Sequence, residues 1–220
     1  MFLAYNYVMD WPEFKFLERY LQFTDTVIDI GANIGIYVLW ISKFTGNVIA
    51  FEPDPTNALR LQQQIDLNNL TVVVERCAVS NVNGTVGFST GKDMENHIVQ
   101  DNGKCDVRSV RLDDYGLERI HFLKVDVEGA EILVLQGAER LLSGHCVDVI
   151  QLEFNLGSPS YFGSSDESVL RLLEHHGYEL FQYSPTQNRL VRFEIGSNEH
   201  SNALAIYDHA FVAGRISANL

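Results

Sequence analysis

An acidic residue followed by a glycine-rich turn is the first group in the sequence that could bind a ligand. Asp29 interrupts the apolar run of "VIDIGANIGIY", and Gly31 and Gly35 frame the turn that follows. Glycine lets a backbone turn tightly and approach a ligand without an intervening Cβ, and Asn33 is of a type that tolerates the left-handed conformation. Glu52 comes about 20 residues after the turn, where a carboxylate can accept both hydroxyls of a ribose. These residues indicate a nucleoside-binding site.

The spacing of the glycines separates the nucleotide classes. A dinucleotide site needs G-x-G-x-x-G to admit a pyrophosphate at a helix N-terminus, and a P-loop needs a Gly-Lys-Ser/Thr sequence. The stretch "GANIGIY" supplies neither pattern. A nucleoside without a phosphate remains, and S-adenosylmethionine fits that description. A ligand-free strand-to-helix turn is the alternative, and the position of Glu52 weakens it.

A second acidic group, "DVEGAE", spans residues 126–131. We expect Glu128 and Glu131 to lie one turn apart at the start of a helix, where the macrodipole favours acids, so a structural role explains them as well as a catalytic one. Asp126 ends an expected strand, and a functional role is favoured for it. These acids could hold magnesium together with Glu153, but one cluster is thin support, and we expect no metal.

A histidine is the other candidate for proton transfer. His97 lies in a polar loop near the edge where a second substrate would enter, and a neutral imidazole is the commonest general base near pH 7. An exposed loop histidine without a role is the alternative. We therefore rank Asp126 above His97 as the residue that acts on the substrate.

Strands and helices alternate along the chain and explain where these residues would meet. Runs rich in β-branched residues alternate with segments in which apolar residues recur at helical spacing. The expected strands are residues 26–31, 47–52, 70–75, 120–127, 147–154, 178–184 and 202–208, and the expected helices are 33–44, 54–68, 129–142 and 166–176. This pattern predicts an α/β fold: a single doubly wound, mostly parallel seven-stranded sheet with helices on both faces. Ligands bind beyond the carboxyl ends of such strands.

One segment interrupts the alternation. Asn83-Gly84 is a strong hairpin signal inside residues 76–112.

The last two expected strands have no helix between them, so we expect them to be antiparallel neighbours. The sequence thus predicts one domain over residues 1–220, with an N-terminal lead-in at 1–25 and a hairpin and loop insertion at 76–112.

Composition narrows the possible partners. The formal net charge of −13 disfavours nucleic acid and anionic membranes, which are bound mainly through Lys and Arg. The three cysteines are widely spaced, which suggests neither a disulfide framework nor a zinc site. The N-terminus lacks a basic leader and no run of 18 apolar residues occurs, so we expect a cytoplasmic protein with no membrane partner. The oligomeric state is left open.

The motifs together resemble a known family. "VIDIGANIGIY", "AFEPDP", "ERCAVSNVNGTVGF", "SVRLDDY" and "LKVDVEGAE" occur in the order and wording of the FkbM-type methyltransferases, over about residues 25–155. That family is class I and uses S-adenosylmethionine on a Rossmann-like fold. Its typical chemistry is O-methylation of a small molecule, often a sugar or a secondary-metabolite hydroxyl.

The resemblance implies roles for individual residues. Glu52 would hold the ribose, the backbone amide of Ala78 would meet the adenine ring, and Asp126 would face the methyl-donor end. The methionine side of the cofactor would be lined by Asp29, Gly31, Ala32, Asn33 and Gly35. The resemblance thus implies methyl transfer from S-adenosylmethionine to a hydroxyl of a small-molecule acceptor. An NAD-dependent oxidoreductase and a catalytically silent nucleoside-binding module remain as alternatives.

Overall fold

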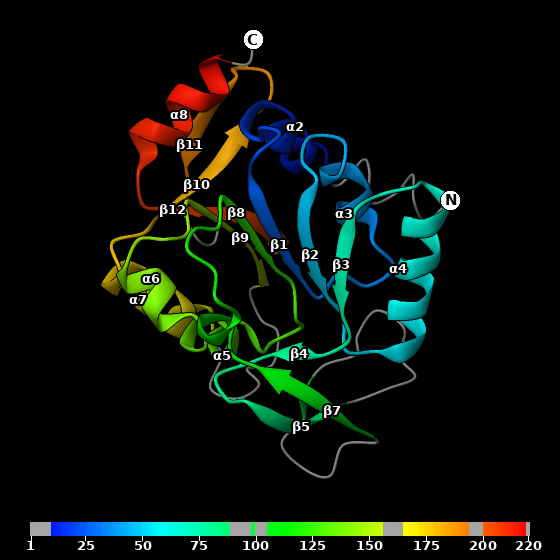
Figure 1. The fold of residues 1–220 in the computed structure, drawn as a ribbon. Helices are drawn as coiled ribbons and strands as arrows, with labels where there is room; N and C mark the ends of the chain where they lie inside the picture. The colour runs from blue at the N-terminus through cyan, green and yellow to red at the C-terminus, as the bar shows by residue number, and fades with distance from the viewer. Residues whose placement is uncertain (1–9, 89–97, 100–104, 156–164, 194–199, 219–220) are drawn as a thin grey trace.

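The core of the fold is an eight-stranded sheet with helices on both faces (Figure 1). The computed structural model describes residues 10–88, 98–99, 105–155, 165–193 and 200–218. The strands of this large sheet are β1 (Thr26–Ile30), β2 (Asn47–Phe51), β3 (Val72–Glu75), β8 (Phe122–Val125), β9 (Val149–Asn155), β10 (Glu179–Ser184), β11 (Arg189–Arg192) and β12 (His200–Ile206). Their order is β11-β10-β12-β9-β8-β1-β2-β3.

The parallel part of the sheet runs from β9 to β3, as the sequence predicts. β10 and β12 are antiparallel neighbours, which confirms the prediction for the last two strands. The expected count of seven strands is wrong by one, because β11 adds an eighth strand at the edge. In β11 two arginines enclose only two apolar residues, Leu190 and Val191, so it lacks the apolar run by which the other strands are recognised. Charged side chains of this kind are common on exposed edge strands.

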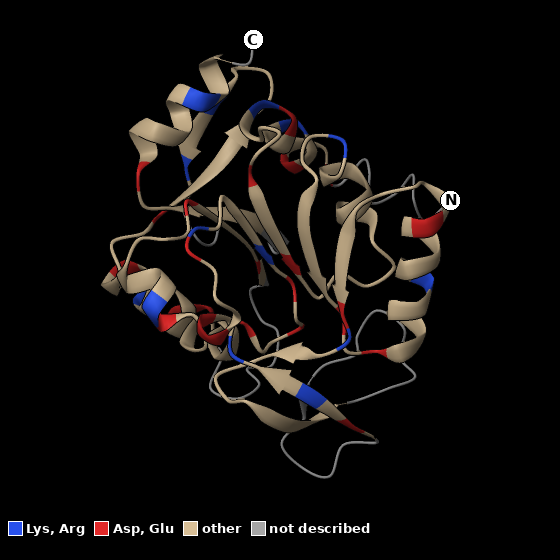
Figure 2. Ribbon diagram, in the orientation of Figure 1, with Lys and Arg blue, Asp and Glu red and all other residues tan. Residues whose placement is uncertain are grey.

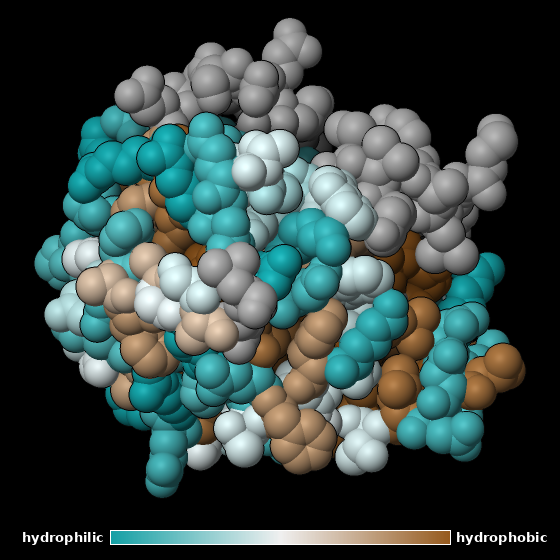
Figure 3. Space-filling model, turned by 90° about the horizontal axis from the view of Figure 1, so that it is seen from above, coloured by the Kyte–Doolittle hydropathy of each residue, from teal (hydrophilic) through white to brown (hydrophobic). Residues whose placement is uncertain are grey.

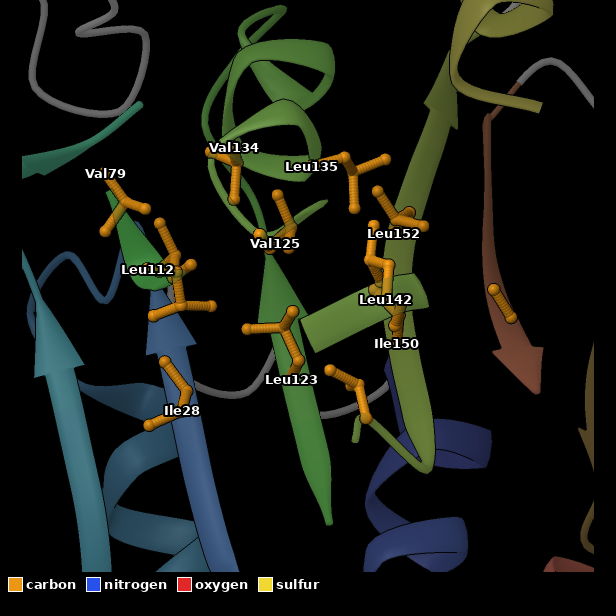
Figure 4. Packing of buried hydrophobic residues seen from close by; sticks show 14 of the residues in the cluster. Ile28, Val79, Leu112, Leu123, Val125, Val134, Leu135, Leu142, Ile150 and Leu152 are labelled. Atoms are coloured by element: carbon orange, nitrogen blue, oxygen red, sulfur yellow. The ribbon is translucent and has the colours of Figure 1, made fainter. Parts of the chain in front are cut away.

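The helices divide between the two faces of the sheet. One face carries α2 (Trp11–Tyr20), α3 (Ile36–Ile41), α4 (Pro55–Leu67) and α8 (His209–Ala218), and the other carries α5 (Glu131–Gln136), α6 (Glu139–Ser143) and α7 (Asp166–His175). Successive strand residues point to opposite faces, so Val27 packs with the first group of helices and Ile28 with the second. Figure 4 shows the core under the second group of helices, in which Leu152 of β9 lies near Leu135 of α5.

Two helices stand where the sequence predicts one at residues 129–142. α5 and α6 are separated at Gly137, and a Cβ at Gly137 would lie 2.1 Å from the Ser80 carbonyl oxygen. The backbone amides of Arg140 and Leu141 in α6 donate to the Asp113 carboxylate at 2.8 and 3.1 Å. A carboxylate from a distant segment thus caps α6, a contact that local spacing could not predict.

A second, smaller sheet lies beyond the carboxyl ends of the parallel strands (Figure 1). It contains β4 (Ala78–Val79), β5 (Gly84–Phe88), β6 (Ile98–Val99) and β7 (Cys105–Val110), in the order β4-β7-β5-β6, and η1 (Leu112–Tyr115) follows β7. The expected hairpin at Asn83-Gly84 is wrong, because β4 and β5 each pair with β7 instead of with each other. The Asn83 side chain accepts from the Arg111 amide at 2.8 Å and donates to Asp114 at 2.7 Å, so it fixes a connection that turns toward β7.

The surface seen from above mixes hydrophilic and hydrophobic side chains (Figure 3). The large hydrophobic residues that are exposed to solvent include Phe23, Leu67 and Val73. Singly exposed hydrophobic residues are normal on a folded protein. Within the described ranges, no helix combines the length and apolarity needed to cross a bilayer.

A buried ion pair ties the last helix to the start of β1. Arg215 of α8 donates to the Asp25 carboxylate, which also accepts from the Gln22 amide at 2.8 Å. Asp25 is 2% exposed, and the Arg215 guanidinium lies over the Tyr20 ring at 4.6 Å. The pair therefore joins α8, α2 and β1 at the end of the sheet opposite the small sheet.

We expect Arg215→Met to lower the free energy of unfolding by about 3 kcal/mol, because it leaves the Asp25 carboxylate buried without its cation. Urea denaturation followed by circular dichroism measures this change. Arg171→Met is the matched control, since the Arg171–Glu167 pair is exposed on α7 and such pairs contribute about 0.5 kcal/mol or less. Equal losses in the two variants would contradict the assigned role of the buried pair.

Candidate functional site

The turn after β1 has the conformation that its residue types predict. Gly31, Asn33 and Gly35 have φ values of 81°, 51° and 91°, in the left-handed region. A Cβ on Gly31 would lie 1.8 Å from the carbonyl oxygen of Asp126, and one on Gly35 would lie 2.4 Å from Leu61. Packing inside the protein thus explains both glycines, because Gly31 lets the turn lie directly against the backbone of Asp126 and Gly35 leaves room for the Leu61 side chain. The turn occupies residues expected to be helical, and α3 begins only at Ile36.

Glu52 lies against the same turn. It follows β2 directly and is 5% exposed, and its two carboxylate oxygens accept from the Asn33 and Asp54 amides, each at 2.8 Å. Burial raises its pKa to about 7, against the opposing effect of these two hydrogen bonds. Each carboxylate oxygen can accept a second hydrogen bond. Glu52 therefore fixes the turn and keeps acceptor capacity for a ligand's hydroxyls.

Three polar side chains form a row across the sheet beside this turn. Asp29 of β1 is the register partner of Lys124 in β8, and Lys124 is the partner of Gln151 in β9, so all three lie on the face covered by α2 and α3. The Lys124 ammonium is 3.9 Å from Asp29 and 2.8 Å from Asp126, and it lies 4.7 Å from the centre of the Tyr37 ring. Tyr37 in turn accepts a hydrogen bond from Gln151 at 3.1 Å.

Burial and charge act against each other in this row. Burial raises the pKa of Asp29 to about 6, although Lys124 favours the ionised form, and both Asp29 oxygens lack a hydrogen-bond partner in the described part of the chain. The pKa of Lys124 lies above its usual value because the attraction of Asp126 and Asp29 outweighs burial, which lowers it. Lys124 was not predicted as a site residue. The available signal was a lysine inside an apolar strand, two residues before Asp126 and so on the same face.

A cavity of about 50 Å³ opens where this row meets the carboxyl ends of β8 and β9 and the start of the antiparallel β12. Its lining residues are Asp10, Tyr37, Lys124, Val125, Asp126, Gln151, Leu152, Glu153 and Asn202. Acidic positions gather where the parallel strands end (Figure 2). Asp10, in the N-terminal lead-in, accepts from the Asn202 side chain at 3.3 Å, and burial raises its pKa. Asp10, the residue directly before α2, therefore contributes to the site.

The "DVEGAE" segment departs from the predicted helix start. Glu128 and Gly129 have φ values of 53° and 93°, and the helix begins only at Glu131, so Glu128 lies in the loop. The expectation that Glu128 and Glu131 share the first helical turn is therefore wrong. Glu131 accepts from the Gly129 amide at 3.0 Å, and burial raises its pKa. This contact gives Glu131 a structural role in holding the loop.

The remaining predicted residues lie farther out or outside the described chain. Ala78 is buried in β4 of the small sheet and packs with Phe88 and Ala130. His97 falls outside the described residues. Across the described ranges, no group of three or more His, Cys, Asp or Glu residues could hold a metal ion. Asp126 and Glu153, the acids considered for magnesium, line the same cavity as the Lys124 ammonium.

Comparisons with known proteins identify a family for this chain. Residues 29–180 match the methyltransferase FkbM domain. The hexuronic acid methyltransferase AglP of Haloferax volcanii is 30% identical over 139 residues, which are 60% of this chain and 57% of that protein. The chain spans between 57 and 60% of the length of the curated relatives that it matches.

Solved structures share the fold. A methyltransferase FkbM from Methylobacillus flagellatus aligns with a TM-score of 0.55 and 16% identity, over 92% of this chain and 60% of that one. A Streptococcus mutans protein solved in complex with SAH, S-adenosylhomocysteine, aligns with a TM-score of 0.51 and 11% identity, over 88% of this chain and 95% of that one. At these identities the likeness extends to the fold alone.

We expect the side-chain carboxyl of Asp29 to titrate with a midpoint near 6 in a ¹³C NMR experiment. Because this folded-state pKa is above the ordinary value, the group's contribution to stability is complete below about pH 4 and is lost as the pH rises through 6. Lys124→Met should raise the midpoint further, since it removes the cation that favours the carboxylate.

Lys43→Met is the control for this titration, because Lys43 lies over the Trp40 ring on α3 and has no contact with Asp29 among the interactions found in the described residues. It should leave the Asp29 midpoint unchanged. A wild-type midpoint near 4, or an equal response to both lysine variants, would contradict the arrangement of the buried row.

Proposed function

The chain belongs to the FkbM methyltransferase family, and we propose that it transfers a methyl group from S-adenosylmethionine to a hydroxyl oxygen of a small molecule. The observation that carries this proposal is the convergence of the turn, Glu52 and Asp126 at one edge of the sheet. The Asn33 amide donates to Glu52, and Gly31 lies against the Asp126 backbone. The hexuronic acid methyltransferase named among the relatives supports a sugar as the acceptor class, alongside a secondary metabolite.

The residues at this edge fit the cofactor chemically. Glu52 offers carboxylate oxygens for the ribose hydroxyls, and the turn from Gly31 to Gly35 would line the methionine side. Asp29 and Asp126 would place negative charge near the cationic sulfonium and amino groups. The Ala78 segment, in the small sheet beyond the strand ends, would meet the adenine ring.

Methyl displacement asks little covalent chemistry of the protein. The cofactor supplies an electrophilic methyl group, and the chain must hold the acceptor hydroxyl in line with it, exclude water and accept a proton. Asp126 is our candidate for this task, because it follows β8 directly beside the turn and its side chain is 39% exposed. The Lys124 ammonium donates a hydrogen bond to that carboxylate at 2.8 Å. Displacement from a sulfonium needs no Lewis acid, so the proposal includes no metal.

Glu52→Ala should weaken SAH binding by about one to two decades, because loss of a charge-assisted hydrogen-bond acceptor costs roughly 1–3 kcal/mol. Isothermal titration calorimetry measures the affinity, and circular dichroism checks that the turn variant is folded. Glu174→Ala on the exposed side of α7 is the matched control and should bind like the wild type. Equal SAH affinities for the wild type and Glu52→Ala would contradict the assignment of Glu52 to the ribose site.

Asp126→Asn should lower single-turnover methyl transfer by about 10²- to 10⁴-fold, the usual contribution of positioned proton transfer. SAH affinity should stay within a few-fold. The assay uses a hydroxylated acceptor found by screening, with Asp66→Asn at an exposed position of α4 as the control. Wild-type rates in Asp126→Asn would make Asp126 a structural residue. Activity that is lost on chelation and restored by magnesium would instead assign Asp126 and Glu153 to a metal.

A further inference from the structure

The cavity at the ends of β8, β9 and β12 contains an acceptor atom that the protein does not use. Gln151 is 2% exposed, and its amide nitrogen donates to the Tyr37 hydroxyl at 3.1 Å. Its amide oxygen has no hydrogen-bond partner among the described residues, and Gln151 lines the cavity. A buried acceptor left unpaired costs about 1–3 kcal/mol, so a ligand group that donates a hydrogen bond would be favoured there.

The charge of the lining points the same way. Three carboxylates, Asp10, Asp126 and Glu153, line the cavity together with one ammonium, Lys124. That ammonium already lies 2.8 Å from Asp126 and 3.9 Å from Asp29, so these two carboxylates offset its positive charge before a ligand binds. A ligand carboxylate would therefore meet net negative charge at short range, where like charges repel strongly.

The strand order assigns this cavity to the methyl acceptor. β9 and β12 lie on one side of β8, whereas Glu52 and the cofactor turn lie on the other side, at the ends of β2 and β1. Asp126, at the end of β8, stands between the two. The cavity of about 50 Å³ admits a few water-sized groups, not a sugar ring, so only one functional group of an acceptor would enter.

We propose that this cavity anchors the methyl acceptor through a group that donates hydrogen bonds, a hydroxyl or an ammonium, and that it excludes a carboxylate. Gln151 is the specificity-determining residue, because its free oxygen accepts from that group while Tyr37 fixes its nitrogen. The inference rests on the proposed methyl transfer, since it divides the edge of the sheet into a cofactor side and an acceptor side.

The test uses three two-carbon probes that share a hydroxyl and differ in the second group: ethanolamine, ethylene glycol and glycolate. Each is titrated into SAH-saturated protein while the side-chain amide signals of Gln151 and Asn202 are followed by ¹H–¹⁵N NMR. We expect saturable shifts with ethanolamine and ethylene glycol, and at least about tenfold weaker binding of glycolate. The ratio of the first two affinities tells whether an ammonium or a hydroxyl is preferred.

Gln151→Met keeps the volume of the side chain and removes the acceptor. We expect it to weaken ethanolamine and ethylene glycol binding about tenfold at the Asn202 signal, with SAH affinity within about twofold of the wild type. Gln62→Met, at a half-buried position of α4 outside the cavity lining, is the control and should change neither. Glycolate binding as strong as that of the diol, no saturable shift with any probe, or unchanged binding in Gln151→Met would each overturn the subsite.

Titrations without SAH separate this inference from the proposed function. Failure to bind SAH would speak against the proposed function, while the probes would still report on the cavity. If SAH itself displaces the probes, the cavity belongs to the cofactor and the acceptor subsite is wrong.

Discussion

A buried ammonium organises the carboxyl edge of the sheet. Lys124 is 6% exposed, and removing an ammonium from water costs several kcal/mol unless opposite charges lie close by. Asp126 at 2.8 Å and Asp29 at 3.9 Å meet that requirement. The same contact orients the Asp126 carboxylate next to the Gly31 turn. The position of the proposed reacting carboxylate therefore follows from the need to offset the Lys124 charge inside the sheet.

The backbone converts this constraint into a site with two sides. Gly31 approaches the Asp126 carbonyl, and the Asn33 amide donates to Glu52, so β1, β2 and β8 converge on the side that we propose for the cofactor. β9 and β12 extend the same edge away from Glu52. There Gln151 and Asp10 add an acceptor and a charge from segments far apart in sequence. The order of the strands thus supports the proposed division into a methyl-donor side and a methyl-acceptor side.

Local sequence patterns predicted what depends on local conformation. The turn glycines, the antiparallel final strands and the start of α4, where Asp54 accepts from the Thr56 and Asn57 amides, all follow from residue type and spacing. The errors arose where a distant contact decides the outcome. Asp113 caps α6 and divides the expected helix, while β7 lies between the strands of the expected hairpin.

The site itself was predicted in part for the same reason. Glu52 and Asp126 could be recognised because each follows an apolar strand. The importance of Lys124 and Gln151 depends on the register of three strands, which brings Asp29, Lys124 and Gln151 into one row. Asp10 could not be placed from spacing, since only the packing of α2 brings it to the cavity.

The mass spectrum of small molecules released from the purified, denatured protein after incubation with S-adenosylmethionine tests the central claim most directly. The account predicts S-adenosylmethionine or S-adenosylhomocysteine at about one molecule per chain, and release of a nicotinamide cofactor, or of no nucleoside at all, would contradict it.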